Sequence, residues 1–126
     1  MMDKVVAVEN RKLTRWRLVY HLRVFDRDTD TLLGHIADVS DSGVMVVNGE
    51  PIEIERDFNI WMEVPRDDGS RERMAVQARS IWTAADSNPR FNNTGFYLKE
   101  TSAEIISGIR VMIEEFGRSR DNLLRG

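Results

Sequence analysis

Two short clusters in this chain combine residue types that suit an anionic, hydrogen-bonding ligand. The first contains Arg11 and Arg15, four positions apart, and the second contains Asp38, Ser40 and Gly43 in the pattern D-x-S-x-x-G. A guanidinium group pairs bidentately with phosphate oxygens or with O6 and N7 of guanine, and it stacks on flat rings. A carboxylate accepts N–H donors, a hydroxyl donates or accepts, and a glycine lets the backbone approach closely.

Each cluster alone has an ordinary explanation. Arg11 and Arg15 could be solvated surface charge, and R-x-x-x-R occurs often by chance. The second cluster is also a good turn sequence, because Asp and Ser bond nearby backbone groups and Gly ends the turn. Asp38 follows Arg15 by 23 positions, and the resemblance described below rests on the two clusters occurring together in this order.

Most of the chain predicts β-structure, because apolar and polar residues alternate with a period of two. The predicted strands are residues 16–25, 32–39, 43–47, 58–64, 73–82 and 95–99. Turns are predicted at residues 26–30, at Asn48-Gly49 and at Asp68-Gly69, and a polar loop is predicted over residues 84–93.

The last part of the chain changes to a helical period. Thr101 and Glu104 fit a capping box, and Gly117 fits a helix end. Between them lies one apolar stripe, formed by Ile105, Ile109, Met112, Ile113 and Phe116. Short strands followed by one helix predict a small all-β barrel of roughly six antiparallel strands with a C-terminal α-helix over one mouth or flank.

The paired motifs inside this β-then-helix order resemble those of PilZ domains, which are small β-barrel receptors for the bacterial second messenger cyclic di-GMP. The resemblance spans roughly residues 9–116, and it extends to Gly34, Ile81-Trp82 and Gly95-Phe96. We therefore expect a single-domain protein, with a flexible N-terminal arm over residues 1–10, a PilZ-like domain over residues 11–117 and a polar tail over residues 118–126.

The resemblance implies a ligand site made of two halves. Arg11 and Arg15 would lie on a flexible segment before the first strand and would clamp guanine and phosphate. Asp38, Ser40 and Gly43 would form the half on the barrel. Asp41 and Ser42 fall at variable positions of the motif, so the resemblance assigns them no role.

Three further residues are weaker candidates for the cyclic di-GMP site. Trp82 ends a late strand, where some relatives contact the ligand, although it could equally pack on the barrel wall. Arg17 could add a phosphate contact. Asn10 precedes the first arginine, where the residue type influences whether one ligand or an intercalated ligand dimer binds, and Asn10 leaves both open.

Composition restricts the other classes of function. The 126 residues carry a net charge of −3, which argues against a general nucleic-acid binder. No cysteine and no apolar run of about 20 residues occurs, and the first ten residues lack a signal-peptide core, so we expect a cytoplasmic protein without membrane insertion. His21 and His35 stand in strand patterns, and no catalytic, cofactor or metal motif is visible, so an enzyme is not expected.

The leading hypothesis is a cyclic di-GMP sensor whose N-terminal arm changes conformation and signals to a partner protein. The resemblance implies control of motility, exopolysaccharide synthesis or biofilm formation. One alternative is a nucleotide-independent adaptor on the same fold. Another is an OB-like binder of single-stranded nucleic acid, which the aromatic content of 8% and the acidic charge disfavour. Both a monomer and a dimer are compatible with the sequence.

Overall fold

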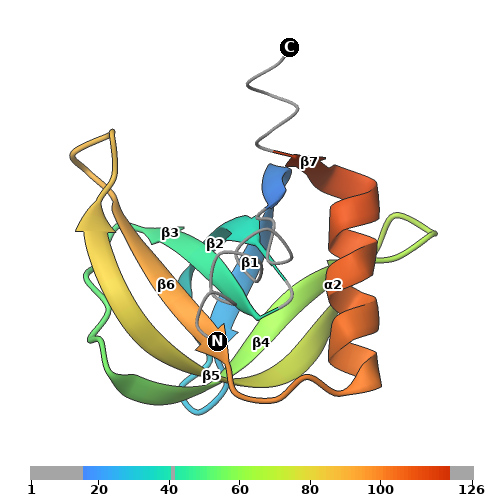
Figure 1. The fold of residues 1–126 in the computed structure, drawn as a ribbon, viewed down its shortest axis with the longest axis horizontal. Coiled ribbons are helices and arrows are strands. Elements are labelled where there is room, and N and C mark those ends of the chain that lie inside the picture. Colours follow the sequence, from blue (N-terminus) through green and yellow to red (C-terminus); the bar gives the residue numbers. More distant parts are fainter. Residues whose placement is uncertain (1–15, 41, 120–126) are drawn as a thin grey trace, which may run out of the picture.

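The computed structural model describes residues 16–40 and 42–119, which form strands and one helix (Figure 1). The elements in chain order are β1 (Trp16–Asp26), β2 (Thr31–Val39), β3 (Gly43–Asn48), β4 (Arg56–Pro65), β5 (Arg71–Ala85), β6 (Asn92–Leu98), α2 (Ala103–Phe116) and β7 (Gly117–Ser119). Within these residues, no helix is long and apolar enough to cross a membrane.

The strands close into a barrel. Hydrogen bonding runs in the order β2-β3-β6-β5-β4-β1, and β1 also pairs with β2, so that six antiparallel strands form a ring. Closure pairs both free edges of the sheet. The short β7 then adds to β1. The predicted six-stranded antiparallel barrel with a C-terminal helix is thus confirmed.

The strand boundaries differ from the predicted ones mainly at the turns. The predicted turn at Asp68-Gly69 joins β4 to β5, where the Gly69 N–H donates to the Arg66 carbonyl oxygen over 3.0 Å. Asn48-Gly49 ends β3, but it does not make a two-residue hairpin, because β3 pairs with β2 and β6. The predicted polar loop is shorter than expected, since β5 continues to Ala85 and β6 begins at Asn92.

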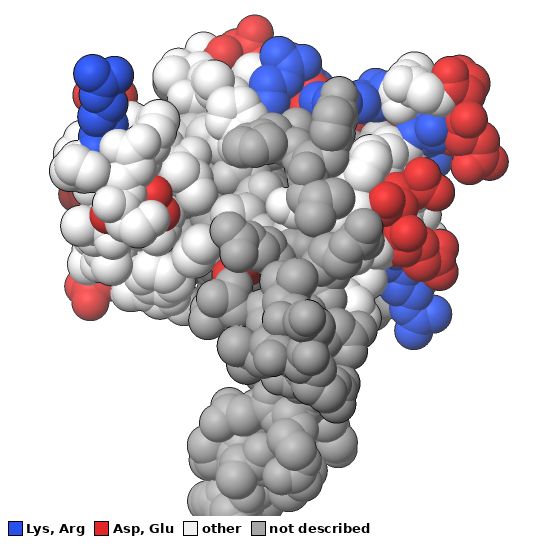
Figure 2. All heavy atoms as spheres, turned by 90° about the horizontal axis from the view of Figure 1, so that it is seen from above, with Lys and Arg blue, Asp and Glu red and all other residues white. Residues whose placement is uncertain are grey.

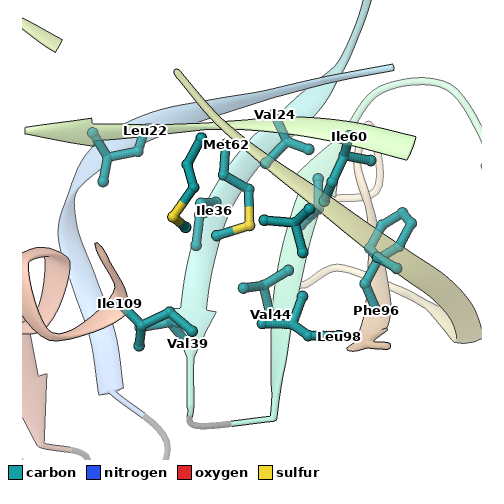
Figure 3. Close-up of a cluster of buried hydrophobic side chains, with 14 of the residues drawn as sticks. Leu22, Val24, Ile36, Val39, Val44, Ile60, Met62, Phe96, Leu98 and Ile109 are labelled. Atoms are coloured by element: carbon teal, nitrogen blue, oxygen red, sulfur yellow. The ribbon is translucent and has the colours of Figure 1, made fainter. Parts of the chain in front are cut away.

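The barrel is filled by alternate side chains of its strands, and α2 covers it beside β1 and β4. Ile105, Ile109 and Met112 of α2 are buried, which confirms most of the predicted apolar stripe. Figure 3 shows Ile109 within the cluster that the barrel residues Leu22 and Val39 also form. Each such side chain contributes about 1.5–3 kcal/mol when fully buried, so the helix is an integral part of the fold.

The N-terminal end of α2 differs from the sequence-based prediction, whereas its C-terminal end agrees with it. The N-cap is Ser102 and not Thr101, because the Ser102 hydroxyl oxygen accepts the Ile105 N–H over 3.3 Å. At the other end the helix stops at Gly117 as expected, and the chain then continues through the first two residues of the predicted polar tail, Arg118 and Ser119. It forms β7, whose residues pair with β1 from Trp16 to Leu18.

A buried carboxylate connects three strands on the outside of the barrel. Glu63 of β4 is only 3% exposed. Its oxygens accept the Arg23 backbone N–H over 2.8 Å, the Arg23 Nη2 over 2.7 Å and the Arg71 Nη1 over 3.1 Å. Burial raises the pKa of Glu63, but the hydrogen bonds from Arg23 and Arg71 and the positive charge of Arg23 outweigh it, and the pKa lies below its usual value. Glu63 therefore ties β1 and β5 to β4.

We expect Glu63→Gln to lower the free energy of unfolding by about 1–3 kcal/mol at neutral pH. The loss is moderate for a buried carboxylate, because Arg23 is half exposed and solvent partly screens its charge. The folded-state pKa is depressed, so the stabilisation is complete above the unfolded pKa and is lost as the pH falls through the folded pKa. Urea unfolding at a series of pH values should show the difference from wild type shrinking in acid.

The exposed ion pair between Glu72 and Arg66 gives the control for this variant. Glu72→Gln should change stability by at most about 0.5 kcal/mol, because exposed pairs contribute little. Equal effects of Glu63→Gln and Glu72→Gln would contradict the structural role of the buried carboxylate.

Candidate functional site

The D-x-S-x-x-G segment forms the tight connection from β2 to β3. The Ser40 N–H donates to the Gly43 carbonyl oxygen over 2.9 Å, and the Ser42 N–H approaches the Ser40 hydroxyl oxygen at 3.4 Å. The second contact is at the long end of the range for a hydrogen bond, so the Ser40 hydroxyl remains able to bind a better partner. The segment therefore forms the turn that its sequence predicts, and this turn places Ser40 at the end of the barrel.

Gly43 is required by the packing of β3 on β6. A Cβ atom at this position would lie 2.7 Å from the carbonyl oxygen of Phe96, closer than real Cβ atoms come to backbone. Gly43 lies opposite Tyr97 in the β3–β6 ladder. The close packing of β3 on β6 therefore explains why glycine occupies this position of the motif, without reference to a ligand.

A cavity of about 140 Å³ opens beside this turn, on the side of β6 and the end of β5. Its lining residues come from four strands and from the β2–β3 turn: Asp38, Val39, Ser40, Ser42, Gly43, Val44, Met45, Ile81, Trp82, Gly95, Phe96 and Tyr97. The structure thus brings together Asp38, Ser40, Gly43 and Trp82, four of the residues singled out from the sequence. We call this hollow the motif cavity.

Asp38 supplies the charged group of the motif cavity. It is 3% exposed and lies at the end of β2, opposite Met45 in β3 and opposite Arg17 in β1. A carboxylate here can accept N–H donors from a bound molecule. For Arg17 only the backbone position is described, so its expected phosphate contact stays a prediction.

Trp82 reaches the motif cavity through a β-bulge. Ser80 lies opposite Phe96 and Trp82 lies opposite Gly95, so Ile81 is an extra residue between the two pairs. The indole lies against Gly95, where a Cβ atom would meet the Trp82 Nε1 at 2.1 Å. Trp82 therefore both packs on the barrel wall and lines the cavity.

Two exposed residues that the sequence did not select as ligand contacts complete the rim of the motif cavity. Ile81 is 47% exposed and Tyr97 is 51% exposed. The signal for Tyr97 was present, because it stands between the buried Phe96 and Leu98 and must face outward in a strand. An exposed aromatic ring beside a cavity offers a surface on which a flat ring can stack.

Among the described lining residues, the charge of the motif cavity comes from one carboxylate. Any cation for an anionic ligand would have to come from elsewhere in the chain. Arg11, Arg15 and Asn10 lie outside the described residues. Figure 2 shows one face of the molecule, where the basic and acidic side chains that are visible are mixed along the rim. The described surface in this view therefore shows no extended region in which all charged side chains have the same sign.

The contact of Trp82 with Gly95 gives a prediction about the shape of the motif cavity. Gly95→Ala should displace the indole, shift the tryptophan fluorescence and lower the free energy of unfolding by about 1–3 kcal/mol. In a Trp82→Ala background the same substitution should cost little, because the clashing atoms are gone. Additive effects in this double-mutant cycle, measured by urea unfolding, would refute the contact.

Comparison with solved structures relates this arrangement to PilZ domains. The chain is similar to the Bacillus subtilis inhibitor of motility MotI/DgrA, with a TM-score of 0.66, 14% identity, and coverage of 83% of this chain and 50% of that one. It is also similar to the PilZ domain with c-di-GMP of YcgR from Escherichia coli, with a TM-score of 0.59, 13% identity, and coverage of 91% and 94%.

These matches establish a PilZ-like fold. The chain spans about half the length of MotI/DgrA and nearly all of the YcgR domain. No family model matches the chain, and no curated protein sequence matches it. At such low identity the likeness concerns the fold, and function has to be argued from the site.

Proposed function

We propose that this protein is a non-enzymatic receptor for cyclic di-GMP. The proposal rests on one observation: Asp38, Ser40 and Gly43 line a single cavity, and Trp82 lines it as well. The first three residues were selected from the motif alone. The similarity of the fold to a PilZ domain with cyclic di-GMP supports the same ligand class.

The size of the motif cavity indicates how the ligand would be shared between two halves of a site. Sites for small molecules usually measure about 300–1,000 Å³, whereas this cavity measures about 140 Å³. It therefore accommodates only part of a cyclic dinucleotide, such as one base. The segment before β1 that carries Arg11 and Arg15 would cover the remainder and supply the positive charge that the phosphates need.

Each described residue has a chemical role in this arrangement. The Asp38 carboxylate accepts from the N1 and N2 donors of a guanine, and the Ser40 hydroxyl donates to a phosphate or accepts. Trp82 and Tyr97 offer flat surfaces for stacking. Gly43 keeps β3 close to β6, so that the cavity retains its shape.

Binding would change the conformation of the N-terminal arm and so alter the surface that a partner protein meets. The domain would then signal through that partner in the bacterial cytoplasm, in the control of motility, exopolysaccharide synthesis or biofilm formation. The receptor needs no metal ion or cofactor for this role.

Calorimetric titration with cyclic di-GMP tests the proposal, with GTP as the comparison ligand. We expect micromolar or tighter binding of cyclic di-GMP, no binding of GTP, and a fitted stoichiometry that distinguishes one ligand from two. Asp38→Asn should weaken binding at least about tenfold, which corresponds to about 1.4 kcal/mol. The exposed Asp67 is the matched control, and Asp67→Asn should bind as the wild type does.

Absence of binding, both by calorimetry and by a fluorescence titration of the tryptophans, would overturn the receptor proposal. The nucleotide-independent adaptor would then be the function to pursue on the same fold.

A further inference from the structure

Two aromatic side chains lie together on the outside of the barrel. Phe25 of β1 lies opposite Trp61 of β4. Both residues face outward, because Val24 and Met62 beside them in the two strands are fully buried and side chains alternate along a strand. The two rings therefore form an aromatic floor on the outer face of β1 and β4, outside the core and outside the motif cavity.

Three guanidinium groups lie over this aromatic floor. The Cζ atom of Arg27 is 4.7 Å from the centroid of the Trp61 ring. The Cζ atoms of Arg73 and Arg23 are 4.1 Å and 5.3 Å from the centroid of the Phe25 ring. A stacked guanidinium uses its flat face, whereas its N–H donors lie in its plane. Stacking thus orients these arginines and leaves their N–H donors directed sideways.

Contacts between described residues use only part of this donor capacity. Arg23 donates to Glu63 through Nε over 3.0 Å and through Nη2 over 2.7 Å. The Nη1 atom of Arg73 lies 3.4 Å from Asp30, at the long end of the range for a hydrogen bond. Among the described residues, no carboxylate pairs with Arg27. The face therefore presents further N–H donors to a bound molecule.

The charge of this face is opposite in sign to that of the whole chain. Arg71 joins the three stacked arginines there, because it also donates to Glu63. Among the described residues, the carboxylates in contact with the four arginines are Glu63 and Asp30, which leaves a net charge of +2. The complete chain carries −3. A partner that complements this face would be acidic.

The helix α2 packs on the inward-facing residues of the same strands. Its Gly108 lies against Met74 of β5 and Val64 of β4, and both of these side chains are buried. Arg73 and Ala75, on either side of Met74 in β5, are exposed. The outer face of β1, β4 and β5 is therefore accessible to another molecule.

We propose that this outer face binds an acidic segment of a partner protein. The carboxylates of Asp and Glu pair with guanidinium groups through charge-assisted hydrogen bonds. An apolar side chain next to them would cover Trp61, which is only partly buried. Trp and Arg are enriched at the residues that dominate binding in protein interfaces. Because stacking already orients the arginines, less side-chain entropy is lost on binding.

The distribution of charge favours a protein segment over a nucleic acid or a membrane. Those polyanions bind through an extended basic surface. Here Glu63 and Asp30 lie among the arginines, and Asp28 is exposed in the adjoining turn. A short segment can place its carboxylates beside the arginines and avoid Asp28. This interaction requires no cyclic di-GMP, so it is independent of the proposed function.

Selection from a phage-displayed library of random peptides tests the chemistry of the partner. The wild-type protein is the target, and the double variant Arg27→Glu/Arg73→Glu is used for counter-selection. We expect the enriched peptides to combine Asp or Glu with an apolar residue. As synthetic peptides they should bind the double variant at least about tenfold more weakly, which corresponds to about 1.4 kcal/mol. Arg110→Glu, on the exposed side of α2, is the control and should bind as the wild type does.

An NMR titration of isotope-labelled protein with one enriched peptide locates the contact. The indole N–H of Trp61 and the Nε–H of Arg27 should shift, whereas the indole N–H of Trp82 in the motif cavity should not. If the NMR spectrum shows that the double variant is unfolded, the neutral substitution Arg27→Gln replaces it. That variant should weaken binding at least about threefold.

Enriched peptides without acidic residues, or acidic peptides that bind wild type and variant equally, would overturn the proposal. Tighter binding of phosphatidylglycerol vesicles or of a single-stranded oligonucleotide to the same arginines would assign the face to phosphate groups. A dimer in sedimentation that the double variant lacks would assign it to a second copy of the chain. Both results would also overturn the proposal. All measurements are made without nucleotide, so their failure and a failed cyclic di-GMP titration are distinguishable.

Discussion

A chain carrying Arg15→Ala is expected to bind cyclic di-GMP at least about 100-fold more weakly than the wild type. The described half of the site offers a carboxylate, and an anionic ligand needs cations to balance it. Bidentate, charge-assisted hydrogen bonds are about twice as strong as neutral ones, and the loss of about 2.8 kcal/mol corresponds to a factor of 100. Calorimetry at a fixed salt concentration measures the change.

The control for this prediction is Arg110→Ala, which removes the same charge from the exposed side of α2. Its affinity for cyclic di-GMP should equal that of the wild type. If the Arg15→Ala and Arg110→Ala variants bind cyclic di-GMP equally well, Arg15 contributes only to the overall charge of the protein. The segment that carries Arg15 is then not half of the site.

The second large effect is expected from Gly43→Val. The Cβ of the new side chain would lie 2.7 Å from the Phe96 carbonyl oxygen, and a backbone atom within a ladder cannot move aside without opening the β3–β6 pair. We expect a loss of about 2–4 kcal/mol in the free energy of unfolding, together with loss of the motif cavity. Urea unfolding and ligand titration report the two effects.

Gly49→Val is the matched control, since nothing lies within 4 Å of a Cβ atom at that glycine. It should change the free energy of unfolding by less than about 1 kcal/mol. Were Gly43→Val tolerated equally well, β3 and β6 would not approach each other as closely as the structure has them.

The barrel could be predicted because most of its strands have one face in the core. Phe58, Ile60, Met62 and Val64 alternate along β4, and all four are buried. The same reasoning fails for Glu63, which occupies the outward phase and is nevertheless buried. Arg23 and Arg71 cover it from neighbouring strands, and no pattern within one strand shows which side chains a neighbour contributes.

Two other structural features, a bulge and a short strand, depend on contacts with neighbouring strands that the local sequence does not specify. The bulge at Ile81 is defined only by the register of β5 against β6, so the position of Trp82 over Gly95 could not be predicted. The strand β7 is three residues long and pairs with the start of β1, which β4 leaves uncovered because β4 pairs with β1 only at Val24–Asp26. Short segments of this kind take their conformation from tertiary contacts more than from propensity.

The structure places three of the predicted site residues at one cavity, and their contacts with a ligand stay predictions. Asp38, Ser40 and Gly43 are close in sequence, so a single turn suffices to bring them together. Tyr97 and Ile81 come from distant strands, and their place on the rim required the strand order. The expected roles of Arg11, Arg15 and Asn10 stay predictions.

The pairing of β7 with β1 has a consequence for protein engineering. Ser119, at the end of β7, lies opposite Trp16, at the beginning of β1. Chains whose ends lie close together tolerate circular permutation, and the exposed turn at residues 66–70 offers a place for new termini. In such a permutant the segments before Trp16 and after Ser119 would become one continuous loop fixed at both ends, and a fluorophore within that loop would report the proposed binding of cyclic di-GMP.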